Sequence, residues 1–132
     1  MRMKKLCLAI TIALGMLVCG CQILQNDIKE GQYVTEVEEG TLSRPTLSLW
    51  EDDKHFTFYY DTLSSYMPMG TYEIKNGKVI ATTEGGYETY TFQIKDEETL
   101  VFLAGESTKI SMIKGRVSVV DGAEFHWEEP EL

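Results

Sequence analysis

Short runs of β-forming residues, each followed by turn residues, dominate the chain after residue 30. The clearest unit is GTYEIKNGKVIATT at 70–83, where Asn76-Gly77 supplies the two positive-φ positions that a type I′ hairpin turn requires. Alternation on both sides of this turn places apolar side chains on one face and mostly polar side chains on the other. The turn predicts three cross-strand pairs: Lys75 with Lys78, Ile74 with Val79, and Tyr72 with Ala81.

Similar runs recur at intervals of roughly ten residues, which is typical of an antiparallel all-β domain. They are GQYVTEV (31–37), TLSLW (46–50), HFTFYY (55–60), YETYTFQIK (87–95), TLVFLA (99–104) and the weaker ISMI (110–113), RVSVV (116–120) and AEFHW (123–127). A tight polar turn joins the second run to the third. Across it we expect two leucines to face three aromatic residues, namely Leu47 and Leu49 opposite Phe56, Phe58 and Tyr60.

These runs amount to about eight to ten strands, with no convincing helix after the N-terminal segment. We therefore predict an all-β fold, an antiparallel up-and-down meander that forms a small closed or half-closed, lipocalin-like barrel. Closure is favoured because it removes exposed sheet edges. A curled, open meander sheet is the alternative.

The N-terminal segment has the pattern of an export signal. Residues 1–5 are basic and residues 6–18, LCLAITIALGMLV, are almost wholly apolar, but this run falls short of the ~20 apolar residues that span a bilayer. Val18-Cys19-Gly20-Cys21 resembles the lipobox of bacterial lipoproteins, which implies cleavage between Gly20 and Cys21 and lipidation of the Cys21 sulfur. A plain signal peptide with a free cysteine is the alternative.

This interpretation divides the chain into a signal peptide helix at 1–20, a polar tether at 21–30 and a β-barrel domain at 31–132. Cys21 would be the only cysteine of the mature chain, so neither a disulfide nor a cysteine metal site is expected. Two or more acyl chains anchor a protein stably, because each buried methylene contributes ~0.8 kcal/mol. We expect the protein on the outer face of a bacterial cell membrane.

The charge balance argues against two classes of direct partner. Of the 12 basic residues, Arg2, Lys4 and Lys5 would leave with the signal, and 9 would remain against 21 acidic residues. An acidic body of this kind repels nucleic acid and anionic headgroups, so neither is expected as a direct partner.

A family resemblance covers about residues 31–126. The stretches GTYEI, NGKVIATTEGGYETYTFQIKDEETLVFLAGES, LSSYMPMG and DGAEF resemble a small β module of lipoproteins from Gram-positive anaerobes. A similar module is appended to the extracellular end of BlaR-type membrane metallopeptidases, relatives of the β-lactam sensor-transducers. The resemblance implies an extracytoplasmic location and a sensing or regulatory setting. It implies no catalytic residue.

Two patterns in the sequence resemble catalytic or metal-binding motifs. Ser111-Met112-Ile113-Lys114 matches the S-x-x-K of penicillin-recognising enzymes, but there the serine opens a helix in a larger domain, whereas here it lies in a β-like run. His55 with Asp52 and Asp53 matches the spacing of no known cation loop. We therefore predict a non-enzymatic protein with no catalytic residue, no metal site and no cofactor.

The connection DTLSSYMPMG at 61–70 is longer and more apolar than a hairpin turn needs. Its bulky residues either fold inward as a plug or stay exposed as a contact site, and adaptable methionine side chains suit such a surface. The candidate contact loop comprises Leu63, Ser64, Ser65, Tyr66, Met67 and Met69. The expected function is binding or sensing at the cell envelope, with an envelope protein or a small ligand as partner, or alternatively a structural envelope lipoprotein without a small ligand.

Overall fold

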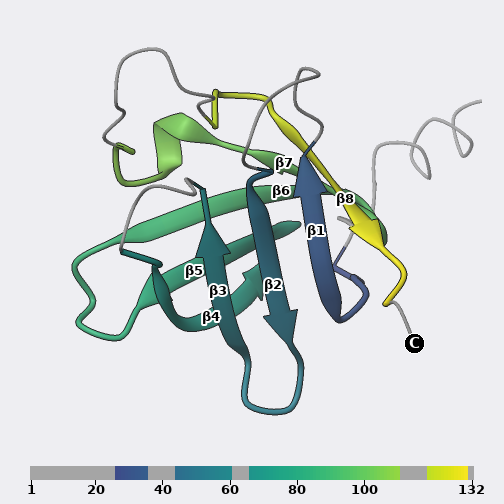
Figure 1. Ribbon diagram of the computed structural model, residues 1–132, viewed down its shortest axis with the longest axis horizontal. Coiled ribbons are helices and arrows are strands. Elements are labelled where there is room, and N and C mark those ends of the chain that lie inside the picture. The colour runs from purple at the N-terminus through teal and green to yellow at the C-terminus, as the bar shows by residue number, and fades with distance from the viewer. Residues whose placement is uncertain (1–25, 36–43, 61–65, 111–118, 131–132) are drawn as a thin grey trace, which may run out of the picture.

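The computed structural model describes residues 26–35, 44–60, 66–110 and 119–130. These residues form eight strands and one 3-10 turn (Figure 1). The strands are β1 (Gly31–Thr35), β2 (Thr46–Trp50), β3 (His55–Tyr59), β4 (Met69–Lys75), β5 (Lys78–Thr83), β6 (Thr89–Asp96), β7 (Thr99–Phe102) and β8 (Glu124–Glu128), and η1 covers Ala104–Glu106. The predicted signal peptide at 1–20 and the first part of the tether lie outside the described residues.

The eight strands close into one barrel in simple meander order, and every neighbouring pair is antiparallel. The closing contact joins the first strand to the last, with Tyr33 opposite Trp127 and Thr35 opposite Phe125. The predicted all-β up-and-down barrel is confirmed in its closed form, and the open meander sheet is wrong.

Both predicted hairpins have the predicted register. In β4 and β5, Tyr72 pairs with Ala81, Ile74 with Val79 and Lys75 with Lys78. Asn76 and Gly77 have φ values of 54° and 73°, as the two central residues of a type I′ turn require. In β2 and β3, two leucines pair with two phenylalanines, Leu47 with Phe58 and Leu49 with Phe56.

Of the three weaker C-terminal runs, AEFHW is confirmed as a strand, because β8 covers most of it. Residues 111–118, which hold most of ISMI and RVSVV, lie outside the described residues. Ile110, Val119 and Val120 are described and belong to no strand. Between β7 and β8 the chain instead runs through η1 and then back along β6, where the Thr108 amide donates to the Thr89 carbonyl at 2.7 Å.

Meander order sorts the connections into two ends. We call the lower end the one that holds the tight turns β2–β3, β4–β5 and β6–β7; of these, the β2–β3 turn is drawn at the bottom of Figure 1. At the upper end lie the β5–β6 turn at 84–88, residues 66–68 before β4, and the segment from Leu103 through η1. The two ends therefore have different chemistry, because one is built of tight polar turns and the other of longer connections.

Aromatic side chains fill the space between the strands. Phe58 lies at the centre of this core, with its ring centroid 5.2–6.3 Å from five other aromatic rings. Those rings belong to Tyr60, Tyr90, Phe92, Phe102 and Phe125. Most of the contacts are tilted or edge-to-face, the arrangements that aromatic pairs prefer. The inward face of the meander is thus a packed core.

Candidate functional site

The interior was the first candidate for a ligand site. A hollow barrel would have a pocket lined by Phe58, Tyr72, Tyr90 and Phe92, but each of these side chains is buried and belongs to one continuous core. Phe92 packs edge-to-face on Phe58 at 5.5 Å, so the two rings occupy the middle of the barrel. Among the described residues, aromatic rings therefore occupy the middle of the barrel, and the outer surface is the next candidate for binding.

A group of exposed apolar side chains lies at the upper end. Tyr66 is 50% exposed, Met67 39% and Met69 40%, and all three lie at the start of β4 or just before it. The neighbouring β5–β6 turn carries Tyr87, which is 90% exposed. We call these four residues the upper patch.

Residues 66–68, directly before β4, are held in place by the backbone and by the buried Pro68. Pro68 is buried, and its carbonyl accepts a hydrogen bond from the Phe58 amide at 2.9 Å. The Met69 carbonyl accepts one from the Glu84 amide at 3.1 Å. The patch therefore rests on two strands and a turn that are fixed by main-chain bonds.

Glu88 links the patch to the core. One of its carboxylate oxygens accepts a hydrogen bond from the Tyr66 hydroxyl at 2.9 Å, and the other accepts one from the Tyr90 hydroxyl at 2.5 Å. The bond to Glu88 raises the pKa of Tyr66, and burial together with the same carboxylate raises the pKa of Tyr90. Tyr66 is thereby oriented by a group that is itself anchored in the barrel.

A pocket of about 500 Å³ lies nearby, between the segment after β7 and the residues before β8. Phe102, Ile110 and Val119 give it an apolar floor, and Lys109 and Asp121 lie at its margin. The Ala104 amide donates to the Asp121 carboxylate at 2.9 Å, which ties the two walls together.

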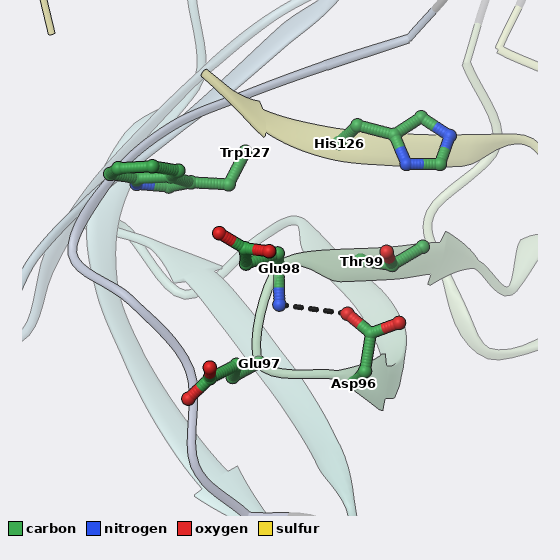
Figure 2. Close-up of a pocket in the computed structure, with 6 residues that line it drawn as sticks. All are labelled: Asp96, Glu97, Glu98, Thr99, His126 and Trp127. Carbon is green, nitrogen blue, oxygen red and sulfur yellow. Dashed lines mark hydrogen bonds between the residues drawn. The ribbon is translucent and has the colours of Figure 1, made fainter. Parts of the chain in front are cut away.

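A second pocket, of about 380 Å³, lies at the lower end and is drawn in Figure 2. Its sides are the β6–β7 turn, with Asp96, Glu97 and Glu98, and the end of β8, with His126 and Trp127. The Glu98 amide donates to Asp96 Oδ1 at 2.9 Å, and this hydrogen bond lowers the pKa of Asp96. The Lys29 ammonium already lies 4.4 Å from the centre of the Trp127 ring.

The other predicted residues are placed as follows. Gly20, Cys21, Leu63, Ser64, Ser65 and the Ser111–Lys114 pattern lie outside the described residues. Of the contact loop, the structure therefore brings together Tyr66, Met67 and Met69. His55 pairs with Trp50 across the β2–β3 hairpin, with their ring centroids 5.5 Å apart, while Asp52 and Asp53 are exposed in the turn. Within the described ranges, no three His, Cys, Asp or Glu side chains lie close enough to hold a metal ion.

Comparison with protein-family models, with curated proteins and with solved structures finds no match. In the part of the chain that the structure describes, no helix has the length and apolar composition that a bilayer span needs.

The sequence did not predict two residues of these surfaces, Tyr87 of the upper patch and Trp127 of the lower pocket. Tyr87 was read only as part of an alternating strand, but it lies in the β5–β6 turn and is the most exposed member of the patch. Its position directly after Gly85-Gly86 was the available signal, because two adjacent glycines indicate a turn, and turns lie at the surface. Trp127, in the lower pocket, was predicted only as a strand residue. No local pattern in AEFHW points to its contact with Lys29, near the other end of the chain.

Proposed function

We propose that this protein is a lipid-anchored, extracytoplasmic β barrel that binds a partner protein at the cell envelope through its upper patch, without catalysis. The observation that carries the proposal is the combination of a filled aromatic interior with an exposed apolar group at one end. Large exposed apolar side chains gathered on a monomer often mark contacts, and tyrosine and methionine are favoured in them.

The filled interior also favours this proposal over a carrier of small ligands. Lipocalin-like carriers need a hollow barrel, and here Phe58 and its neighbours occupy the middle. The proposal therefore takes the partner-protein form of the predicted binding module. A sensing role stays part of it, because recognition of an envelope protein is the event that such a sensor would report.

The anchor is tested first. We expect Cys21→Ala to release the protein from the membrane or to leave the signal uncleaved. Detergent phase partitioning with intact mass measurement distinguishes the two outcomes. Equal partitioning of the variant and the parent protein would rule out the lipid anchor.

The patch is tested by photo-cross-linking in the producing cells. A benzophenone side chain at Met67 should give a discrete adduct with one partner, whereas the same group at Glu73, exposed on the outer face of β4, should not. The double change Tyr66→Ser, Met67→Ser should remove the adduct formed from position 69 while the melting temperature stays within a few degrees. Adducts of equal yield at 67 and 73, or loss of several kcal/mol of stability in the double variant, would contradict a contact role.

A further inference from the structure

Residues 26–30, which belong to the predicted polar tether at 21–30, are bound across the lower end of the barrel. We call them the strap. The strap has a hydrogen bond to each of the three tight turns at this end. Asn26 Oδ1 accepts from the Gly77 amide at 2.9 Å, the Lys29 amide donates to the Glu97 carbonyl at 3.1 Å, and Glu30 Oε1 accepts from the Glu51 amide at 3.0 Å.

Two aromatic residues of the barrel fasten the strap. The Trp127 indole Nε1–H donates to the Glu30 carbonyl at 3.0 Å, and the Trp127 ring carries the Lys29 ammonium on its face. The Tyr33 hydroxyl donates to the Lys29 carbonyl at 2.6 Å and to the Glu97 carbonyl at 3.1 Å. The strap is therefore joined to β1, β8 and the β6–β7 turn together.

The strap also has an apolar contact. Ile28 is partly buried and packs against the core from below, so it covers the lower opening of the barrel. The Lys29 ammonium forms an ion pair with Glu98 at 2.5 Å, but both side chains are well exposed, and a pair of this kind contributes little by itself. The apolar contact and the main-chain hydrogen bonds account for most of the attachment.

Covalent geometry then limits how far the barrel can lie from its anchor. Only Gln22–Gln25 separate Cys21 from the strap, and an extended chain of that length reaches ~17 Å at most. Released from the barrel, the whole of 22–30 would reach roughly twice as far. Binding of the strap therefore halves the length of free chain between Cys21 and the barrel. It also fixes the point on the barrel where that free chain begins.

We propose that the strap sets the orientation of the barrel, with the lower end toward the membrane and the upper patch pointing away from it toward a partner. The orientation rests on the proposed lipidation of Cys21. It has to be imposed by the chain, because the lower turns do not attract an anionic leaflet: their exposed carboxylates, Glu51, Asp52, Asp53, Glu97 and Glu98, outnumber the exposed Lys54 and Lys75 at the same end. The short connection Gln22–Gln25 keeps the lower end close to the membrane despite this charge.

The test uses the full-length lipidated protein in vesicles of phosphatidylcholine and phosphatidylglycerol that carry a rhodamine-labelled headgroup. Cys21 is consumed by its lipid, so a single new cysteine can be labelled with a donor dye. Asp53→Cys places the dye in the β2–β3 turn, and Glu84→Cys places it in the β5–β6 turn with the same change of charge. We expect energy transfer to the headgroups to be several-fold more efficient from position 53 than from position 84.

A variant of the strap tests whether the strap is the cause of the orientation. Asn26→Ala, Ile28→Ser, Lys29→Pro and Glu30→Ala together remove the apolar contact, the side-chain bonds of residues 26, 29 and 30 and the Lys29 amide donor, without changing a residue of the barrel. In this background the difference between the two labels should shrink toward zero, while the melting temperature shows that the barrel is still folded. A difference that persists would overturn the role of the strap.

The remaining outcomes are also decisive. Equal transfer from positions 53 and 84 in a protein that floats with the vesicles would overturn the orientation and leave the lipid anchor intact. Failure of the protein to float with the vesicles would overturn the anchor itself, and the orientation with it. The two proposals thus fail in distinguishable ways.

Discussion

At the scale of single residues, the β4–β5 turn depends on two positions with left-handed backbone. Asn76 tolerates this conformation and Gly77 adopts it without strain. Gly77 is also the point where the strap reaches the hairpin, because its amide is the donor to Asn26.

We expect Gly77→Val to lower the free energy of unfolding by about 1–2 kcal/mol, because a β-branched residue is strained at positive φ. Urea denaturation measures the change. Gly105→Val is the control, since a Cβ at Gly105 meets nothing within 4 Å and its φ is not left-handed. An unchanged midpoint for Gly77→Val would show that this turn does not need a left-handed residue.

Two buried tyrosine hydroxyls make the fold sensitive to alkaline pH. Burial raises the pKa of Tyr33 and of Tyr90 above the ordinary value of 10.0. Because the folded pKa exceeds the unfolded one, the stabilisation is complete below about pH 10 and declines as the pH rises above it. We expect the urea midpoint to fall as the pH is raised from about 9 to about 11.

The control for this dependence is Tyr33→Phe. It should be less stable at neutral pH, because the two carbonyls that the hydroxyl satisfies lose a donor, but its midpoint should change less with alkaline pH. The same alkaline slope in the parent and in both the Tyr33→Phe and Tyr90→Phe variants would contradict this assignment.

At the scale of elements, the start of β4 has no room for a side chain. A Cβ on Gly70 would lie 2.1 Å from the Thr82 carbonyl oxygen and 2.8 Å from Thr83 Cα, both of them main-chain atoms of β5. Backbone cannot turn aside as a flexible side chain can, so the strand itself would have to move.

We therefore expect Gly70→Ala to destabilise the barrel by at least the ~1–3 kcal/mol typical of overpacking, and to separate β4 from β5 near the upper patch. Amide hydrogen exchange should show lost protection at Glu84, whose amide donates to Met69. Protection at Lys75 and Lys78, at the far end of the hairpin, should be retained. Wild-type exchange at Glu84 would contradict this account.

The elements differ in how far they could be predicted. The β4–β5 and β2–β3 hairpins were predictable in register because a tight turn and a period of two leave one alignment that buries the apolar face. The strap was not, because NDIKE has no periodicity and its partners lie far away in the sequence. Glu30 and Trp127, for example, are 97 residues apart and join only once the barrel has closed.

The candidate site was predictable only in part, for a related reason. The composition of 61–70 predicted bulky apolar residues that either plug the barrel or stay exposed, and Met67 and Met69 are exposed. Whether such residues point inward or outward depends on how much of the interior the strands already fill. Here Phe58, Tyr90 and Phe92 fill it. The volume that side chains from several strands fill together cannot be predicted from any local pattern.

At the scale of the whole molecule, a filled interior predicts that small apolar molecules find no site inside. Benzene should leave the melting temperature of the wild-type barrel unchanged. Phe58→Ala should cost about 3–5 kcal/mol and open an apolar cavity, so that benzene raises the melting temperature of the variant. Phe92→Leu is the milder replacement if Phe58→Ala does not fold. A benzene-dependent rise in the wild type would show that the interior has room for a ligand.

The pairing of β1 with β8 also governs when the chain can fold. Until β8 has been made, the sheet has two unpaired edges and Tyr33 lacks its cross-strand partner Trp127. Contacts between distant parts of a sequence slow folding, because the entropy of joining them is lost before the contact forms. The nascent chain therefore stays incompletely folded through most of its synthesis. That delay is compatible with the export that we propose, because a chain passes through a translocation channel before it acquires its structure.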